Sequence, residues 1–158
     1  WFLEAGEELP THKEPPSHGG AGRRFLMTSG HTRWSIHSMN MTNNIIQTTH
    51  RGEPFVFIGE RDAADLGIEN GDRVRLVSDV GDSLMQAKIS PAVRPGQVIL
   101  YNGFEPYQHE NWYSQSDLEP GHVKHLGFAG GYGHLKYRLF SWQPIPADRA
   151  VRVDLEKI

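Results

Sequence analysis

Short apolar segments separated by glycine-containing turns constrain the fold of this chain more than any other feature. In residues 72–77, for example, Val74 and Leu76 alternate with two arginines. Alternation with a period of two is typical of a strand that buries one face. Dipeptides with tight-turn chemistry separate segments of this kind, at Asn70-Gly71, Val80-Gly81 and Pro95-Gly96. The sequence therefore predicts a mainly β fold.

Six segments are predicted to be strands and one to be a helix. The strands are residues 23–28, closed by Ser29-Gly30, then 54–58, 72–77, 85–89, 98–101 and 151–155. The first two lack alternation, which favours burial on both faces. Residues 60–66 are rich in helix formers and have acidic residues in the first turn. Gly67 stands where a left-handed residue ends a helix, so we expect Ile68 to fold back onto Ala63 or Ala64.

The composition places the chain among ordinary globular proteins and excludes several classes. Its 158 residues, 37% of them hydrophobic and with a net charge of −3, correspond to about one domain. The absence of cysteine excludes a disulfide scaffold, an iron–sulfur cluster ligated from this chain and a thiolate zinc site. The near-neutral charge argues against nucleic acid as the main partner. No apolar run approaches the ~18–20 residues of a membrane span.

The N-terminal segment differs from the rest of the chain. Residues 1–22 contain several prolines and glycines and few branched apolar residues, which predicts an extended linker from a preceding domain. The domain itself is placed at residues 23–158. The chain starts at Trp1 and carries no recognisable targeting leader, so we expect it to be a segment of a longer protein.

Three segments carry a resemblance to a known family. The first runs from Pro54-Phe55-Val56-Phe57-Ile58 through the helix, Asn70-Gly71-Asp72-Arg73-Val74 and Pro95-Gly96-Gln97-Val98. It resembles the C-terminal molybdopterin-dinucleotide-binding domain of the dimethyl sulfoxide reductase family. The other two segments, residues 28–38 and 130–137, resemble the nitrate reductase, dimethyl sulfide dehydrogenase and ethylbenzene dehydrogenase branch. Residues 101–106 and 131–135 resemble the ethylbenzene type more than nitrate reductase.

This resemblance implies a six-stranded double-psi β-barrel with one or two short helices and long loops. It implies that the barrel contacts bis(molybdopterin guanine dinucleotide) with molybdenum, bound jointly with other domains of a catalytic subunit. The molybdenum ligand and the iron–sulfur cysteines would lie in those domains, and this segment alone would be inactive. The implied partners are the remaining domains and an iron–sulfur electron-transfer subunit, with no nucleic acid and no direct membrane insertion. The implied location is periplasmic, with cytoplasmic as the alternative.

A donor-rich loop after the first predicted strand is the main candidate for cofactor contacts. Its hydroxyls, imidazoles, guanidinium and backbone N–H groups suit phosphates and pterin carbonyls. By resemblance, the cofactor-binding residues are Ser29, Gly30, His31, Arg33, Trp34, Ser35, Ile36, His37 and Ser38. The alternative is a polar surface loop whose apolar residues fill the end of the barrel. His31 and His37 suit either proton transfer or fixed hydrogen bonds to the cofactor.

A glycine-rich loop and a strand-end asparagine complete the predicted site. The loop of residues 127–137 lacks a phosphate-binding signature, so its contacts rest on the resemblance: Gly131, Tyr132, His134 and Lys136. It is equally consistent with a crossover that only packs on the barrel. Asn102 follows a predicted strand, where its amide suits a pterin or guanine edge, although an Asn-Gly turn explains it equally well.

Two further features remain open at this level. Residues 104–125 have little periodicity and many aromatic and histidine residues, which suits a substrate funnel or a surface that docks against another domain. The sequence has nine histidines but neither the cysteines nor the clustered carboxylates that accompany histidine in typical zinc sites, so no protein-ligated metal is predicted. No catalytic residue is assigned. The competing function is a stand-alone double-psi barrel that binds a ligand or a protein without redox activity.

Overall fold

The structure is a computed structural model of the chain. It describes residues 22–31, 33, 39–119, 123–125, 137–139 and 151–158. Nearly all of the linker predicted over residues 1–22 lies outside these residues.

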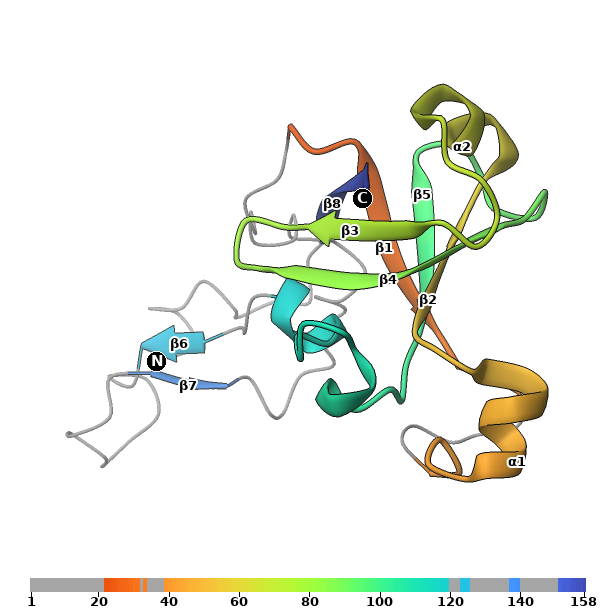
Figure 1. Cartoon of the computed structure of the whole chain (residues 1–158). Helices are drawn as coiled ribbons and strands as arrows, with labels where there is room; N and C mark the ends of the chain where they lie inside the picture. The colour runs from red at the N-terminus through yellow and green to blue at the C-terminus, as the bar shows by residue number, and fades with distance from the viewer. Residues whose placement is uncertain (1–21, 32, 34–38, 120–122, 126–136, 140–150) are drawn as a thin grey trace.

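Six strands form a closed barrel (Figure 1). Around the barrel they follow the order β1-β5-β2-β4-β3-β8. Their bounds are Phe25–Gly30 for β1, Phe55–Ile58 for β2, Arg73–Val77 for β3, Asp82–Ile89 for β4, Gln97–Tyr101 for β5 and Arg152–Lys157 for β8. Strand β1 is parallel to β5 and β2 is parallel to β4, while the other pairs are antiparallel. The prediction of a mainly β, six-stranded barrel is confirmed.

A small second sheet accompanies the barrel. Strands β6 (Val123–His125) and β7 (Tyr137–Leu139) pair antiparallel as two strands. Neither strand was predicted from the sequence, because three-residue strands carry too short a pattern to show periodicity.

The observed strands differ from the predicted ones mainly at their ends. Strand β1 begins two residues later than predicted and continues through Ser29-Gly30. The expectation that β1 is buried on both faces is wrong: Phe25 and Met27 are buried, whereas Leu26 and Thr28 are only half-buried. Only the inner face of a barrel strand meets the core. In β3, Val74 and Leu76 point inward as their alternation predicts.

The helical segments are short. Helix α2 (Glu60–Leu66) ends at Gly67, whose φ of 64° is left-handed, and the N–H of Ile68 donates to the carbonyl oxygen of Ala63 at 2.9 Å. This confirms the predicted helix and its C-terminal turn. Helix α1 (Asn44–Ile46) was not predicted; it continues into a π-helical turn, η1 (Gln47–Arg51), and begins where the side chain of Asn43 accepts hydrogen bonds from two backbone N–H groups.

The apolar core fills the barrel and extends to the segment that follows β5. Its buried side chains come from all six barrel strands and from α2, and Leu118, well outside the barrel strands in sequence, joins the same cluster with no exposed surface. Full burial of one such aliphatic side chain contributes roughly 1.5–3 kcal/mol. Residues 104–119 are therefore tied to the barrel by packing.

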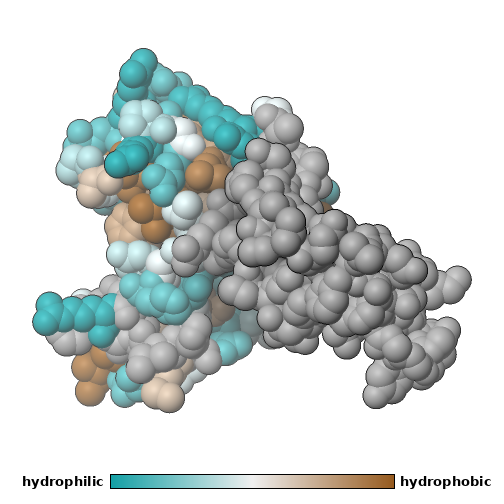
Figure 2. All heavy atoms as spheres, turned by 180° about the vertical axis from the view of Figure 1, so that it is seen from behind, coloured by the Kyte–Doolittle hydropathy of each residue, from teal (hydrophilic) through white to brown (hydrophobic). Residues whose placement is uncertain are grey.

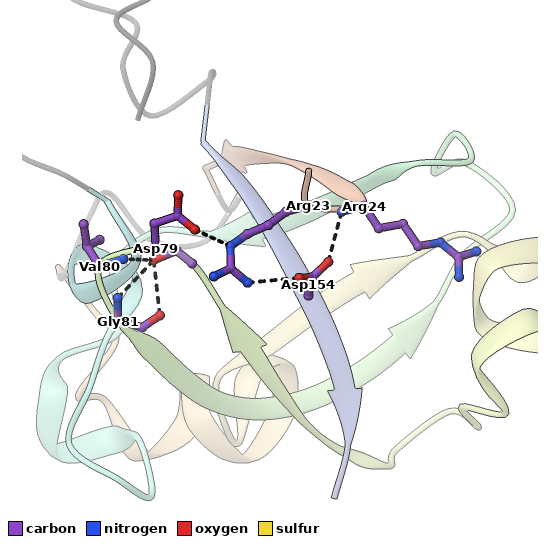
Figure 3. A network of polar contacts seen from close by, with 7 residues as sticks. Arg23, Arg24, Asp79, Val80, Gly81 and Asp154 are labelled. Carbon is purple, nitrogen blue, oxygen red and sulfur yellow. Dashed lines mark hydrogen bonds and ion pairs between the residues drawn. The ribbon is translucent and has the colours of Figure 1, made fainter. Parts of the chain in front are cut away.

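An ion-pair network anchors the start of β1 (Figure 3). The Arg23 guanidinium donates to Asp79 Oδ1 at 2.7 Å and to Asp154 Oδ2 at 2.9 Å, and the backbone N–H of Arg24 donates to Asp154 Oδ1 at 3.0 Å. The hydrogen bond to Asp79 and the charge of both carboxylates raise the pKa of Arg23 above its ordinary value. The network joins the residues directly before β1 to the β3–β4 turn and to β8.

The described surface is mostly polar, with some exposed apolar side chains. Seen from behind, hydrophilic residues dominate the upper part of this surface, and hydrophobic atoms gather in its indented middle (Figure 2). The large exposed hydrophobic residues are Met39, Ile45, Val80, Tyr107, Trp112, Tyr113 and Ile158. Within the described residues, no helix has the length and apolarity that crossing a bilayer requires.

Candidate functional site

A cavity of about 240 Å³ lies at the carboxyl ends of the parallel strands β1 and β5. Residues from both strand ends, from β2 and β4 and from the segment after β5 line it. They include Ser29, Phe55, Met85, Tyr101, Asn102, Phe104, His109, Ser114, Gln115 and Glu119. Two of the lining residues, Ser29 and Asn102, belong to the predicted cofactor-binding set.

Asn102 is held at the strand end by its backbone. Its N–H donates to the carbonyl oxygen of Gly30 at 3.0 Å, which continues the β1–β5 ladder by one bond. Gly103 follows with a φ of 111°, so the Asn-Gly turn explanation is correct for the backbone. The side-chain oxygen Oδ1 is buried and has no hydrogen-bond partner. Leaving a buried acceptor unsatisfied costs about 1–3 kcal/mol, so this atom points to a donor that a ligand supplies.

Gly30 has a structural role beside the predicted one. A Cβ at this position would lie 2.8 Å from Cε1 of Tyr101, so the tyrosine ring packs directly on the glycine backbone. Only glycine leaves this space, and Gly30 thereby positions both Tyr101 and, through its carbonyl oxygen, Asn102. Its direct contact with a cofactor stays a prediction.

Aromatic rings form one side of the cavity. Phe55 packs edge-on against Tyr101, with ring centroids 5.8 Å apart, and against Phe104, with centroids 6.0 Å apart. Phe104 in turn packs edge-on against His109 at 6.3 Å. Nζ of Lys88 lies 3.8 Å from the centroid of the buried Phe55 ring, so the half-buried ring of Phe104 is the one suited to pack against a flat heterocycle.

The segment after β5 is more regular than the sequence suggested. It contains two 3-10 turns, η2 (Pro106–Gln108) and η3 (Gln115–Leu118), each with a capping box at its start. Figure 1 shows η3 next to β4, and η3 packs against that strand. The low periodicity of residues 104–125 hid these turns, because each is too short to show a helical period and is stabilised by its capping box.

His109 is buried and hydrogen-bonded on one side of its ring. Its Nδ1 lies 3.2 Å from Oγ of Ser83 and 3.4 Å from the carbonyl oxygen of Leu84. Burial lowers the pKa of His109, opposed by the bond to Leu84 and the charge of Asp117, so the ring is neutral at neutral pH. A neutral imidazole offers one donor and one acceptor.

Gln115 ties the first strand to the segment after β5. Its Nε2 donates to Oγ of Ser29 at 3.1 Å and to Oε1 of Glu119 at 2.7 Å. The predicted residue Ser29 therefore faces the cavity with a partner that lies far along the sequence.

The predicted site residues are only partly within the described chain. Ser29 and Asn102 line the cavity, Gly30 lies beside it in β1, and His31 and Arg33 are exposed in the segment that follows β1. Nine predicted residues lie outside the described residues: Trp34, Ser35, Ile36, His37, Ser38, Gly131, Tyr132, His134 and Lys136. The convergence of the two predicted loops on one ligand stays a prediction.

Sequence reasoning did not assign the polar residues that the segment after β5 brings to the cavity. These are His109, Ser114, Gln115 and Glu119. The only signal was the density of aromatic and histidine residues between positions 104 and 125. Within the part of the chain that the structure describes, no group of three or more histidine, aspartate or glutamate side chains is placed to hold a metal ion.

Comparison with known families identifies the domain. Residues 25–122, which contain strands β1 to β5 and the whole cavity lining, match the molydopterin dinucleotide binding domain. The chain belongs to this family. The resemblance seen in the sequence is therefore confirmed at the level of the family.

Two relatives in this family match nearly the whole chain. It is 35% identical over 161 residues to the respiratory nitrate reductase subunit alpha of Haloferax mediterranei, covering 99% of this chain and 16% of that protein. It is 30% identical over 155 residues to the dimethylsulfide dehydrogenase subunit alpha of Rhodovulum sulfidophilum, covering 98% and 17%. The chain thus spans about one sixth of the length of these relatives.

A solved structure supports the same fold. Acetylene hydratase from Pelobacter acetylenicus superposes with a TM-score of 0.62 over 99% of this chain and 22% of that protein, at 13% sequence identity. This level of identity supports the fold and nothing finer.

Proposed function

We propose that the chain is the C-terminal cofactor-binding domain of a molybdenum oxidoreductase catalytic subunit and that it contacts bis(molybdopterin guanine dinucleotide). The observation that carries this proposal is the buried, unsatisfied Oδ1 of Asn102 in a cavity of the domain that matches the family. When bound, the cofactor supplies two-electron redox chemistry at molybdenum, while the domain supplies binding and orientation.

The cavity fits one end of such a cofactor. Pockets that enclose a drug-sized ligand measure about 300–1,000 Å³, so about 240 Å³ suits a single heterocycle and not a whole dinucleotide. Aromatic walls contact the faces of a flat ring, and the unsatisfied amide oxygen accepts a hydrogen bond from its edge. The rest of the cofactor would bind to the predicted loops and to other domains of the subunit.

The predicted loop residues complete the proposed contacts. We assign the phosphates and the pterin to the loop after β1 and to the glycine-rich loop. The contact residues proposed beyond the cavity are Gly30, His31, Arg33, Trp34, Ser35, Ile36, His37, Ser38, Gly131, Tyr132, His134 and Lys136. Their donor chemistry, which suits an anionic pterin nucleotide, supports this assignment.

The wider setting of the domain is also a proposal. An iron–sulfur electron-transfer subunit as partner, an ethylbenzene dehydrogenase-like hydroxylating reaction and a periplasmic location, with cytoplasmic as the alternative, rest on the resemblance of the sequence. The two parallel strand pairs, β1–β5 and β2–β4, support a double-psi connection within the barrel.

A stand-alone binding module is the less favoured function. Nearly the whole chain aligns with about one sixth of much longer alpha subunits, which favours a domain of such a subunit. No observation on the cavity favours a protein ligand over a heterocycle.

The proposal is tested by the cofactor content of the full-length protein that contains this chain. We expect molybdenum and, after acid release, guanosine monophosphate to co-purify with it. Asn102→Ala removes the buried acceptor and should weaken retention of both about tenfold, because an unpaired donor in the ligand costs about 1–3 kcal/mol. Asn44→Ala is the matched control, since Asn44 is exposed and outside the cavity. Wild-type protein free of molybdenum and nucleotide would refute the function.

A further inference from the structure

We infer that His109 is a specificity-determining residue of this cavity, whose Nε2 accepts a hydrogen bond from the 2-amino-4-oxopyrimidine edge shared by pterin and guanine. This inference rests on the proposed function and assigns which part of the cofactor the cavity recognises. It follows from the tautomer of His109, from the other acceptors of the lining and from the shape of the walls.

The tautomer of His109 is determined by Ser83. Both residues are buried, and the Ser83 hydroxyl donates to the carbonyl oxygen of Tyr113 at 2.6 Å. A hydroxyl has a single hydrogen, so Ser83 Oγ can only accept from His109. The carbonyl oxygen of Leu84, 3.4 Å from the same Nδ1, can also only accept. The ring proton of neutral His109 therefore lies on Nδ1, and Nε2 carries a lone pair.

Two amide oxygens give the lining the same acceptor character. Oδ1 of Asn102 is buried without a hydrogen-bond partner. Gln115 uses both hydrogens of Nε2, toward Ser29 and Glu119, so only its oxygen Oε1 is left for a ligand. A ligand that satisfies these groups presents several hydrogen-bond donors, and a flat ligand fits beside the aromatic wall that includes Phe104.

His109 also lines a second cavity, which lacks the amide acceptors of Asn102 and Gln115. It contains Arg73, which pairs with Glu53 at 2.8 Å and also with Glu110. These three charged groups are paired with one another and leave a net charge of −1. The unsatisfied acceptor lies on the side of Asn102, and we assign Nε2 of His109 to the ligand of that cavity.

A 2-amino-4-oxopyrimidine edge presents a ring N–H and an amino group side by side. In the proposed cofactor this edge occurs twice, once in the pterin and once in the guanine. The cavity chemistry is the same for both, so the experiment must separate the two sources. Analogues in which a keto group or hydrogen replaces the 2-amino group test the edge itself.

The test measures binding of small probes to the cofactor-depleted full-length protein by calorimetry. The probes are guanosine monophosphate with inosine monophosphate, and 6-hydroxymethylpterin with 6-hydroxymethyllumazine. We expect one of the two amino-bearing probes to bind about tenfold or more tightly than its partner lacking the amino group, because a lost donor leaves a buried acceptor unpaired. The pair that shows this preference identifies the end of the cofactor that the cavity holds.

Variants of His109 assign the preference to Nε2. His109→Phe keeps the ring volume but has no acceptor, and it should abolish the preference; His109→Gln places an amide oxygen near Nε2 and should retain part of it. Urea unfolding of each variant checks that the fold is intact. A preference unchanged in His109→Phe, or no preference in the wild type, overturns the inference. If molybdenum and nucleotide still co-purify with the wild-type protein, that result leaves the proposed function standing.

Discussion

At the residue scale, one buried carboxylate joins three segments of the barrel. Asp62 lies in the first turn of α2, and its Oδ2 accepts from the backbone N–H of Gly96 at 2.7 Å. Its Oδ1 accepts from Arg24 at 2.9 Å, and the same guanidinium nitrogen reaches Asp65 at 3.1 Å. Asp62 is 4% exposed, whereas the carboxylate of Asp65 is largely in solvent. Arg24 thus pairs with one buried and one exposed carboxylate, and the contributions of the two ion pairs to stability can be compared.

Substitution of Asp62 should cost more than substitution of Asp65. In Asp62→Ala the N–H of Gly96 loses its acceptor, and the free energy of unfolding should fall by about 1–3 kcal/mol. Asp65→Ala removes an exposed pair and should cost less than about 1 kcal/mol. Urea unfolding of both variants measures the difference. Equal losses would show that Asp62 acts only as a surface charge.

At the element scale, the turn η3 is seated on the β3–β4 turn by a close backbone approach. A Cβ on Gly81 would lie 2.5 Å from the carbonyl oxygen of Asp117 in η3. The Ser78 hydroxyl oxygen stabilises the turn itself by accepting from the backbone N–H groups of Val80 and Gly81. The Val80-Gly81 turn was predicted from its chemistry, but the reason for this glycine is the neighbouring element and not a positive φ.

Gly81→Ala should push η3 away from the barrel. Overpacking of this kind costs about 1–3 kcal/mol, and the displacement should also increase hydrogen exchange at residues 115–118. Gly22→Ala is the control, because no atom lies within 4 Å of its added Cβ. Hydrogen exchange by mass spectrometry measures the effect. Unchanged hydrogen exchange in Gly81→Ala would mean that the added methyl group does not displace η3.

At the scale of the whole molecule, β8 closes the barrel. It pairs with β1 through Phe25 and Val153 and with β3 through Leu76 and Leu155. Asp154 of the same strand also binds Arg23, which lies just before β1. Without β8 the edges of β1 and β3 are unpaired, and both are exposed to aggregation.

Deletion of residues 151–158 should therefore abolish cooperative unfolding and expose apolar surface. Val151, Val153 and Leu155 leave the core with the strand, and each contributes roughly 1.5–3 kcal/mol when fully buried. Deletion of Ile158 alone is the control, since this residue is 63% exposed and contributes one backbone hydrogen bond. Urea unfolding followed by circular dichroism, with dye binding to exposed apolar surface, distinguishes the two. A cooperative transition in the longer deletion would show that five strands suffice.

Sequence patterns were sufficient to predict the barrel strands, helix α2 and the turns at Gly67, Gly71 and Gly96. Each of these depends on residues within one or two turns of chain: the period of apolar residues, or a backbone conformation that glycine adopts at low cost. Helix α1 and the 3-10 turns escaped prediction because their stability comes from caps at Asn43, Glu105 and Ser114 and from packing on the barrel.

The sequence by itself determined the mainly β class, the family resemblance and two residues of the cavity, Ser29 and Asn102. Only the tertiary structure determined which other residues line the cavity with them. His109 meets Ser83 across 26 residues, and Gln115 meets Ser29 across 86. Contacts at such separations depend on how the barrel strands and the segment after β5 are arranged in space. Local periodicity carries no information about them, because it describes the faces of single elements and not their partners.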